Sequence, residues 1–371
     1  MNILFFGGTG RLSKDAAKLA FEKGHQVTLF TRGSKERSVF ADPHYEMIYG
    51  NIRDGQASAA LLKGRHFDAV VDFLSYSPGQ MESTINIVKH HCKQYIFIST
   101  ATVYRKDNDD EIVSEKSTKI GNDRWEYSRN KALCEKRLED MQHEGLEMRH
   151  TIVRPYVTYG NTRVPYPIVP TNSTKEWSLL ERVIAHRPIP VFDEGKTVTT
   201  LTHTKDFAKG LVGLFGNPLA YGEAFHITND NNNSWGDVLE AIEKKLHVEI
   251  NRAFMSQSDI YKEIPEYETI LTGDKGKSAR FNNDKIKSVV PEFSCDIPLQ
   301  DGISDMIDFY KIHPELRLVD WHWNGQIDRL CKKHGYTLGD KILFGDIGTR
   351  GRYLAGRNSF ICNALRALHS S

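Results

Sequence analysis

Short apolar runs alternate with amphipathic stretches along the first 160 residues of the chain. The stretch 14–23, between the first two runs, has apolar residues at helical spacing. The runs themselves are apolar almost without interruption, which is typical of parallel strands buried on both faces of a sheet. They cover residues 2–6, 26–30, 46–49, 69–73, 95–99 and 150–153. This alternation predicts an α/β fold with an open, doubly wound parallel sheet of the Rossmann type.

The pattern becomes looser after residue 154, where prolines at 155, 165, 167, 170, 188 and 190 interrupt the chain. The run 225–228 predicts one further strand, and 235–246 predicts a helix. We expect an NAD(P)-binding Rossmann domain over 1–160 and about 200–245. Residues 161–199 and 246–320 are expected to form a smaller substrate-binding lobe. The remaining residues, 321–371, form a C-terminal extension for which the sequence indicates no role.

A glycine-rich segment, Gly7-Gly-Thr9-Gly10-Arg-Leu-Ser13, lies between the first predicted strand and the first predicted helix. A strand-to-helix turn that approaches a pyrophosphate needs residues without a Cβ atom, and the amides at the start of a helix bind the anion. The third glycine of the usual spacing is replaced by Ser13, whose side chain is still small. We predict that Gly7, Thr9 and Gly10 contact the pyrophosphate of a dinucleotide cofactor.

The end of the second predicted strand bears on the choice of nicotinamide cofactor. An NAD site usually has a carboxylate here, which binds the ribose 2′-hydroxyl. This chain instead has Thr31 and Arg32, with Lys35 and Arg37 close behind. A cationic cluster favours the 2′-phosphate of NADP, although a solvated basic loop would have the same composition. NADP is therefore the expected cofactor, and NAD is the alternative.

Two polar features follow the fifth predicted strand. In the first, Thr100 places a hydroxyl at the strand end, where it can hydrogen-bond a reacting oxygen. The second is Tyr127-Ser-Arg-Asn-Lys131 in a predicted helix, where residues at i and i+4 share a face. An ammonium beside a phenol lowers the phenol pKa from about 10, so the phenol can exchange a proton with an alcohol or carbonyl. A surface pair is the alternative, but the position after the fifth strand favours a catalytic role.

Taken in order, these features resemble extended or atypical short-chain dehydrogenases/reductases of the NAD-dependent epimerase/dehydratase family. The resemblance covers about residues 1–315. It rests on the glycine turn, Gly50-Asn51-Ile52-Arg53-Asp54, the pair Tyr127 and Lys131, and the segments 70–73, 99–104, 154–160, 203–208, 234–235 and 283–285. It implies that Thr100 is the catalytic Ser/Thr, Tyr127 the acid–base group and Lys131 its partner.

The same resemblance implies a set of cofactor contacts. Arg11 and Leu12 would contact the pyrophosphate through their backbone, and Lys131 would also bind the nicotinamide ribose. Asn51 and Ile52 would flank the adenine. The other implied contacts are Phe73, Leu74 and Ser75 at the end of the fourth predicted strand and Pro155 after the sixth.

Two departures from the family pattern narrow the expected reaction. Dehydratases usually have an Asp-Glu pair after the catalytic Thr, whereas Thr100 is followed by Ala101 and Thr102. Nucleotide-sugar epimerases usually have a diphosphate-binding arginine shortly before the segment that starts at His203, and the stretch 197–202 has none. Lys196, Arg163 and Arg280 are the alternatives for this contact. We expect reversible hydride transfer at a secondary alcohol or ketone, of a sugar or sugar nucleotide. The alternatives are a small-molecule carbonyl reductase and a non-catalytic relative, resembling plastid stem-loop RNA-binding proteins.

Composition and charge exclude some partners. With 49 basic and 48 acidic residues, the formal net charge of +1 gives no general attraction for nucleic acid or an anionic membrane. No apolar run approaches the roughly 20 residues that span a bilayer. The five cysteines are scattered, and neither His90-His91-Cys92 nor Cys331 with His334 supplies a full metal-ligand set. We expect a cytoplasmic protein with a small-molecule substrate and no metal, with a homodimer as one option.

Overall fold

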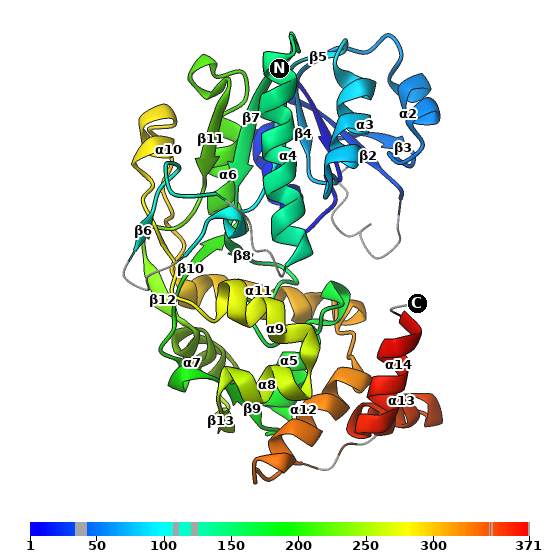
Figure 1. Ribbon diagram of the computed structural model, residues 1–371, viewed down its shortest axis with the longest axis vertical. Helices are drawn as coiled ribbons and strands as arrows, with labels where there is room; N and C mark the ends of the chain where they lie inside the picture. The colour runs from blue at the N-terminus through cyan, green and yellow to red at the C-terminus, as the bar shows by residue number, and fades with distance from the viewer. Residues whose placement is uncertain (34–42, 107–110, 120–124, 341, 343, 370–371) are drawn as a thin grey trace. The chain divides into compact units, whose positions relative to one another are not determined.

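The computed structural model describes residues 1–33, 43–106, 111–119, 125–340, 342 and 344–369 (Figure 1). The chain forms two compact units, each of which is built from three separate segments. The first unit contains Met1–Tyr159, Thr200–Asn232 and Ala279–Ile297. The second contains Gly160–Thr199, Asn233–Ser278 and Pro298–Ser371.

A seven-stranded sheet forms the centre of the first unit, in the order β11-β7-β5-β4-β1-β2-β3. Every neighbouring pair is parallel. The strands are β1 (Asn2–Phe6), β2 (Gln26–Thr31), β3 (Glu46–Tyr49), β4 (Phe67–Asp72), β5 (Cys92–Ile98), β7 (Arg149–Arg154) and β11 (Glu223–His226). The predicted doubly wound sheet is thus confirmed, and the strand order reverses between β1 and β4.

Helices cover both faces of this sheet (Figure 1). Alternate residues of β1 show the division, because Ile3 and Phe5 belong to one buried core and Leu4 and Phe6 to the other. The first core is covered by α1 (Ser13–Glu22) and α6 (Thr204–Gly213). The second is covered by α2 (Gly55–Leu62), α3 (Pro78–Val88) and α4 (Glu126–His143). Burial on both faces explains why the strands are nearly continuous in apolar residues.

Shorter elements complete the first unit. The two-residue strand β6 (Ile112–Val113) pairs with β14 (Arg280–Phe281), and β8 (Val157–Tyr159) pairs with the end of β10 (Val198–His203). Helix α10 (Asp284–Val289) packs against β11, and its Ile286 joins the core beneath α6. A 3-10 turn, η2 (Ala101–Val103), directly follows β5.

The second unit is mostly helical. Helix α7 (Trp235–Leu246) packs on α11 (Leu299–Ile312), and α12 (Trp321–Lys333) packs on α5 (Trp177–Ile184). The strands β9 (Ile189–Val191) and β13 (Arg252–Phe254) form a parallel pair. The other elements are α8 (Gln257–Glu263), α9 (Glu268–Ile270), α13 (Ile347–Arg357) and α14 (Ser359–His369). Strand β12 (Asn232–Ser234) lies where the chain passes from the first unit to the second.

The division of the structure departs from the sequence-based boundaries in three places. Helix α7 belongs to the second unit because it packs on α11, and 279–297 belongs to the first because β14 pairs with β6. Residues 321–371 belong to the second unit. Asp328 of α12 is fully buried there and pairs with Arg182 of α5 at 3.0 Å.

Two further properties of the described residues bear on ligands and location. No helix among them is both long enough and apolar enough to cross a membrane. Over the same residues, no group of three or more His, Cys, Asp or Glu side chains is arranged to hold a metal ion.

Candidate active site

The glycine turn between β1 and α1 is the first part of the site. Gly7 has a φ of +86°, a left-handed conformation that residues with a Cβ rarely adopt. A Cβ at this position would lie 2.7 Å from Cδ2 of Leu74, so only glycine fits without a shift of that side chain. Backbone hydrogen bonds from Gly10 to Gly7 (3.1 Å) and from Lys14 to Gly10 (3.0 Å) close the turn. This is the tight strand-to-helix shape that a dinucleotide turn requires.

Ser13, the residue in place of the third glycine, connects this turn to α1. Its hydroxyl donates to the Gly7 carbonyl at 2.6 Å and accepts from the Gly10 N–H at 3.0 Å. Within the described part of the chain, the N–H groups of Thr9 and Leu12 donate to no protein acceptor. Backbone N–H groups that have no protein acceptor at the start of a helix can donate hydrogen bonds to a phosphate group. The turn therefore fits the pyrophosphate that the sequence predicts there.

Other predicted cofactor residues follow the carboxyl ends of the neighbouring strands. Arg32 comes directly after β2 and is exposed, whereas Lys35 and Arg37 lie outside the described residues. After β3, Asn51 is exposed and Ile52 is buried. Parallel strands end at the same edge of a sheet, so these residues share one edge with the glycine turn. The strand order reverses at this edge, which is where open α/β sheets bind ligands.

The segment after β4 is held in place by Asp72, which the sequence analysis did not assign to the site. Its Oδ1 accepts the N–H groups of Leu74 at 2.7 Å and Ser75 at 3.1 Å. Its Oδ2 accepts the hydroxyl of Tyr95 at 2.6 Å. Burial, together with this carboxylate, raises the pKa of Tyr95 well above its usual value. Asp72 is thus a fully buried anchor for the segment of Phe73, Leu74 and Ser75.

Lys131 is buried at the carboxyl ends of β4 and β5. Its ammonium donates to the carbonyl of Ser75 at 2.8 Å and to that of Ile98 at 2.6 Å. Burial lowers the pKa of Lys131 from 10.5 to about 8, although the negative charge of Asp72 opposes this shift. A lysine that titrates this close to neutral pH is common at catalytic sites.

Tyr127 and Thr100 are placed near Lys131 by the spacing of α4 and by a hydrogen bond between α4 and η2. Tyr127 is in the first turn of α4, one helical turn before Lys131, and is half-buried. The adjacent Ser128 donates to the carbonyl of Thr102 at 2.8 Å, which joins the start of α4 to η2. Thr100 precedes η2, is 5% exposed, and accepts the N–H of Thr102 at 3.3 Å. The structure therefore brings all three predicted catalytic residues to one end of β5 and α4.

Tyr76 also belongs to this group, and the sequence analysis missed it. The Nζ of Lys131 lies 4.8 Å from the centre of its ring. The ring of Tyr127 lies 6.2 Å from the same ring. Tyr76 thus contacts both members of the predicted pair. An isolated tyrosine after an apolar run has no pattern that separates it from a surface residue.

A buried polar network continues from the same face of α4. Glu135, one turn after Lys131, accepts two hydrogen bonds from Arg154 at 2.8 and 2.7 Å. It also accepts the hydroxyl of Ser99 at 2.6 Å. Arg154 donates in turn to the hydroxyl of Tyr104 at 2.7 Å. Glu135 and Arg154 are 2% and 0% exposed, so this network joins α4, β5 and β7 without water contact.

The geometry of the first unit agrees with the match of this chain to a protein family. Residues 3–227 match the NAD dependent epimerase/dehydratase family. The chain belongs to this family. The resemblance noted in the sequence is thereby confirmed, and the seven-stranded sheet is the nucleotide-binding sheet of an epimerase/dehydratase fold.

One curated relative within reach of sequence comparison is the chloroplast stem-loop binding protein of 41 kDa b from Arabidopsis thaliana. It is 28% identical over 244 residues, which are 62% of this chain and 58% of that protein. The chain therefore matches less than two thirds of the length of this relative.

Solved epimerases share the fold of this family member. UDP-glucuronic acid 4-epimerase from Bacillus cereus, in complex with NAD, has a TM-score of 0.66 at 17% identity, over 84% of this chain and 99% of that one. An epimerase from Methanothermobacter thermautotrophicus has a TM-score of 0.70 at 15% identity, over 85% and 94%. UDP-glucose 4-epimerase from Thermotoga maritima has a TM-score of 0.67 at 14% identity, over 85% and 100%. At these identities the likeness shows the fold alone.

Proposed function

We propose that the chain is an NAD(P)-dependent oxidoreductase or epimerase that transfers hydride reversibly at a secondary alcohol or ketone of a sugar or sugar nucleotide. The buried ammonium of Lys131 carries this proposal, since it lies at the ends of β4 and β5, one helical turn after Tyr127. Solved epimerases with the same fold bind NAD and UDP-sugars, which supports the cofactor and the substrate class.

The cofactor would be held along the edge of the sheet that carries the glycine turn. The turn and the start of α1 would hold its pyrophosphate, Asn51 and Ile52 would flank the adenine, and Pro155 and the residues after β4 would line the rest. When bound, the nicotinamide accepts or supplies the hydride. A side chain of the protein must therefore remove and return the proton of the substrate hydroxyl.

Tyr127 would exchange that proton with the substrate oxygen. It removes the hydroxyl proton during oxidation and returns it during reduction. Lys131 supplies a positive charge that favours the phenolate form of Tyr127, and Thr100 donates a hydrogen bond to the reacting oxygen. In an epimerase the ketone is reduced again on its other face, and in a reductase the reaction ends after one hydride transfer.

Arg32 supports NADP as the preferred form of the cofactor. It directly follows β2 and is exposed, in the position where an NAD site usually has a carboxylate. A guanidinium there can bind the 2′-phosphate with two parallel hydrogen bonds. NAD remains the alternative, since it is the form bound by the solved epimerases with this fold.

Elimination of water is not part of the proposed reaction. The two residues after Thr100 are Ala101 and Thr102, which begin η2 and are buried. Neither carries the carboxylate that family dehydratases use to drive the elimination. The stretch before His203 also lacks an arginine for a diphosphate, so free sugars and small carbonyl compounds belong in the substrate screen.

Replacement of Tyr127 by phenylalanine tests the proposal. Turnover would be measured with NADPH or NADH against nucleoside-diphosphate sugars, free sugars and small carbonyl compounds, by absorbance and by NMR of the products. Tyr127→Phe should reduce turnover by about 100-fold or more, while cofactor affinity changes little. Tyr221→Phe is a matched control, because Tyr221 comes just before the amino end of β11, at the opposite edge of the sheet. An unchanged rate in Tyr127→Phe would refute the assignment.

Binding of nucleic-acid stem-loops is a second candidate, favoured by the name of the Arabidopsis relative. The formal net charge of +1 does not support general binding to nucleic acid. A gel-shift experiment with a stem-loop RNA at low and physiological salt separates the two candidates. A salt-dependent shift without any binding of NAD(P) would favour the second candidate over the first.

A further inference from the structure

The ammonium of Lys131 is enclosed by groups from β5 and from the segment after β4 (Figure 1). The carbonyls of Ser75 and Ile98 accept two of its three N–H groups. The rings of Tyr76 and Phe97 lie 4.8 and 4.7 Å from its Nζ. The side chain is almost fully buried, and a buried charge is costly unless an opposite charge offsets it. The surroundings of Lys131 must therefore supply a negative charge.

Two buried carboxylates are candidates for this charge. Burial lowers the pKa of Lys131, and Asp72 and Glu135 oppose this effect by favouring its charged form. Glu135 is already paired with Arg154 at 2.7 Å. Cys134 is also close, but burial raises the pKa of its thiol to about 12, so the thiol is neutral. Within the described part of the chain, Asp72 bonds only to uncharged groups, so its charge is the one left for Lys131.

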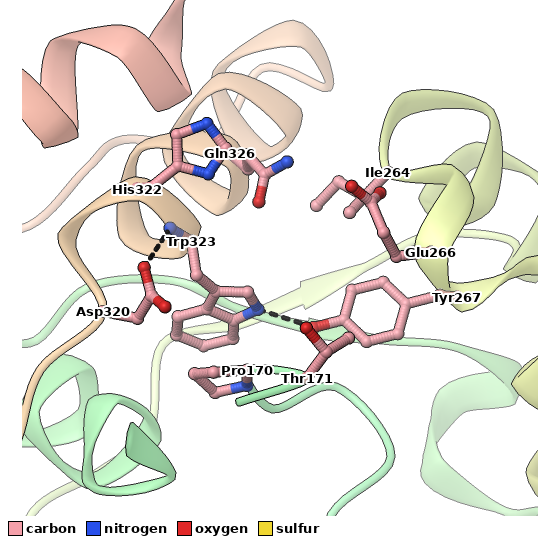
Figure 2. Close-up of a pocket in the computed structure, with 9 residues that line it drawn as sticks. All are labelled: Pro170, Thr171, Ile264, Glu266, Tyr267, Asp320, His322, Trp323 and Gln326. Atoms are coloured by element: carbon pink, nitrogen blue, oxygen red, sulfur yellow. Dashed lines mark hydrogen bonds between the residues drawn. The ribbon is translucent and has the colours of Figure 1, made fainter. Parts of the chain in front are cut away.

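The second unit shows how a buried tyrosine hydroxyl is satisfied without a carboxylate. Tyr267 belongs to the wall of a pocket there, and its hydroxyl accepts the indole N–H of Trp323 at 2.6 Å (Figure 2). The same hydroxyl donates to the Val169 carbonyl at 2.7 Å. The buried Tyr166 likewise donates to the Pro190 carbonyl at 2.8 Å. A buried tyrosine in this chain therefore needs only neutral partners.

The hydrogen bonds of Asp72 do not require its charge either. One carboxylate oxygen accepts the N–H groups of Leu74 and Ser75, and the other accepts the hydroxyl of Tyr95. An asparagine could form the same three bonds, since its oxygen accepts the two N–H groups and its NH2 group donates to the hydroxyl. A buried carboxylate is more costly than a buried amide. The negative charge of Asp72 is thus accounted for by Lys131 and not by its own segment.

We propose that Asp72 is a positioning residue for Lys131: it fixes the Ser75 carbonyl that accepts the ammonium, and its negative charge keeps the ammonium protonated. The proposal rests on the proposed function, in which the charge of Lys131 favours the phenolate form of Tyr127. Asp72 acts on the reaction through Lys131. The phenols of Tyr76 and Tyr127 are the other titratable groups beside the ammonium.

Titration of Lys131 by NMR tests the proposal without a substrate. The lysines are labelled with 13C at Cε, and Lys131→Arg identifies the resonance. In Asp72→Asn the midpoint of Lys131 should move to lower pH by about one unit, because the charge is lost while the hydrogen bonds are kept. Asp68→Asn is the matched control, since Asp68 lies near the amino end of the same strand and pairs with Lys93. The midpoint of Lys131 should not change in this control.

Tyr95→Phe separates the effect of charge from that of packing. It removes one hydrogen bond from Asp72, but the two backbone N–H groups remain, and such donors keep a carboxylate ionised. The melting temperature should fall, and the midpoint of Lys131 should not move to lower pH. This variant tests the proposal even if Asp72→Asn does not fold. An unchanged midpoint in Asp72→Asn, or a lower midpoint in Tyr95→Phe, would overturn it.

The pH dependence of turnover separates this proposal from the proposed function. In Asp72→Asn, the fall of kcat/KM at alkaline pH should begin at a lower pH, by the same shift as the NMR midpoint. A shifted midpoint in a folded protein without turnover would support the effect of Asp72 on Lys131 and count against the proposed function alone. Equal alkaline profiles in the two proteins, despite a shifted midpoint, would overturn the role of Asp72 in the reaction.

Discussion

The contribution of the buried polar network to the free energy of unfolding can be worked out from its ion pair, Glu135 and Arg154. Glu135→Gln removes the negative charge, keeps the side-chain volume, and leaves the guanidinium with an amide in place of a carboxylate. Arg154 is 0% exposed, so water cannot replace the lost partner. Removal of one member of a buried ion pair typically costs about 3–5 kcal/mol, because the other charge stays buried and uncompensated.

Thermal unfolding measured by circular dichroism tests this value. For a unit of roughly 200 residues, 1 kcal/mol changes the melting temperature by about 2–4 °C. Glu135→Gln should therefore lower it by about 6–20 °C.

A second pair on the same helix supplies the control. Glu144 lies 2.8 Å from Arg137, almost the distance of the buried pair, but its side chain is 61% exposed. Glu144→Gln should change the melting temperature by less than about 4 °C, since exposed pairs contribute at most about 1 kcal/mol. Equal shifts in the two variants would refute the reasoning, because burial would then not set the contribution of the pair.

Two further predictions concern the site itself. Burial lowers the pKa of Lys131 to about 8, so its positive charge is lost as the pH rises through 8. The kcat/KM of the wild-type protein should therefore fall above this pH. Arginine stays protonated, so the kcat/KM of Lys131→Arg should not fall in the same range. A pH–rate profile that is identical in the two proteins would contradict a role for the ammonium. Arg32→Glu should weaken NADPH binding about tenfold or more and leave NADH binding within about twofold, measured by fluorescence titration. Arg149→Glu, at the opposite edge of the sheet, is its control, and an equal loss for both cofactors in Arg32→Glu would contradict contact with the 2′-phosphate.

The parts of the molecule that the sequence predicted depend on local spacing. The strand 2–6, the glycine turn and the i, i+4 pair of Tyr127 and Lys131 each follow from residues close together in the chain. From its size, Ser13 was expected only to fit in the turn. Its hydroxyl also forms hydrogen bonds with Gly7 and Gly10, which the size of the side chain does not predict.

What the sequence could not supply depends on contacts between distant segments. Lys131 donates to Ser75, 56 residues away, and Glu135 pairs with Arg154 across α4 and β7. Such pairs follow from the strand order, which alternating apolar runs do not specify. For the same reason the packing of α12 against α5, through Asp328, has no signal in the local pattern.

Binding of the cofactor at the glycine turn is the central claim, and a titration of the nucleotide-free protein with NADPH and NADH tests it most directly. The account predicts saturable binding of one dinucleotide per chain, tighter for NADPH. Gly7→Val should abolish it by distorting the turn, because Gly7 has a φ of +86° and a Cβ there would lie 2.7 Å from Leu74; circular dichroism checks that the variant is folded. Failure of the folded wild-type protein to bind either dinucleotide, or equal binding by Gly7→Val, would contradict the account.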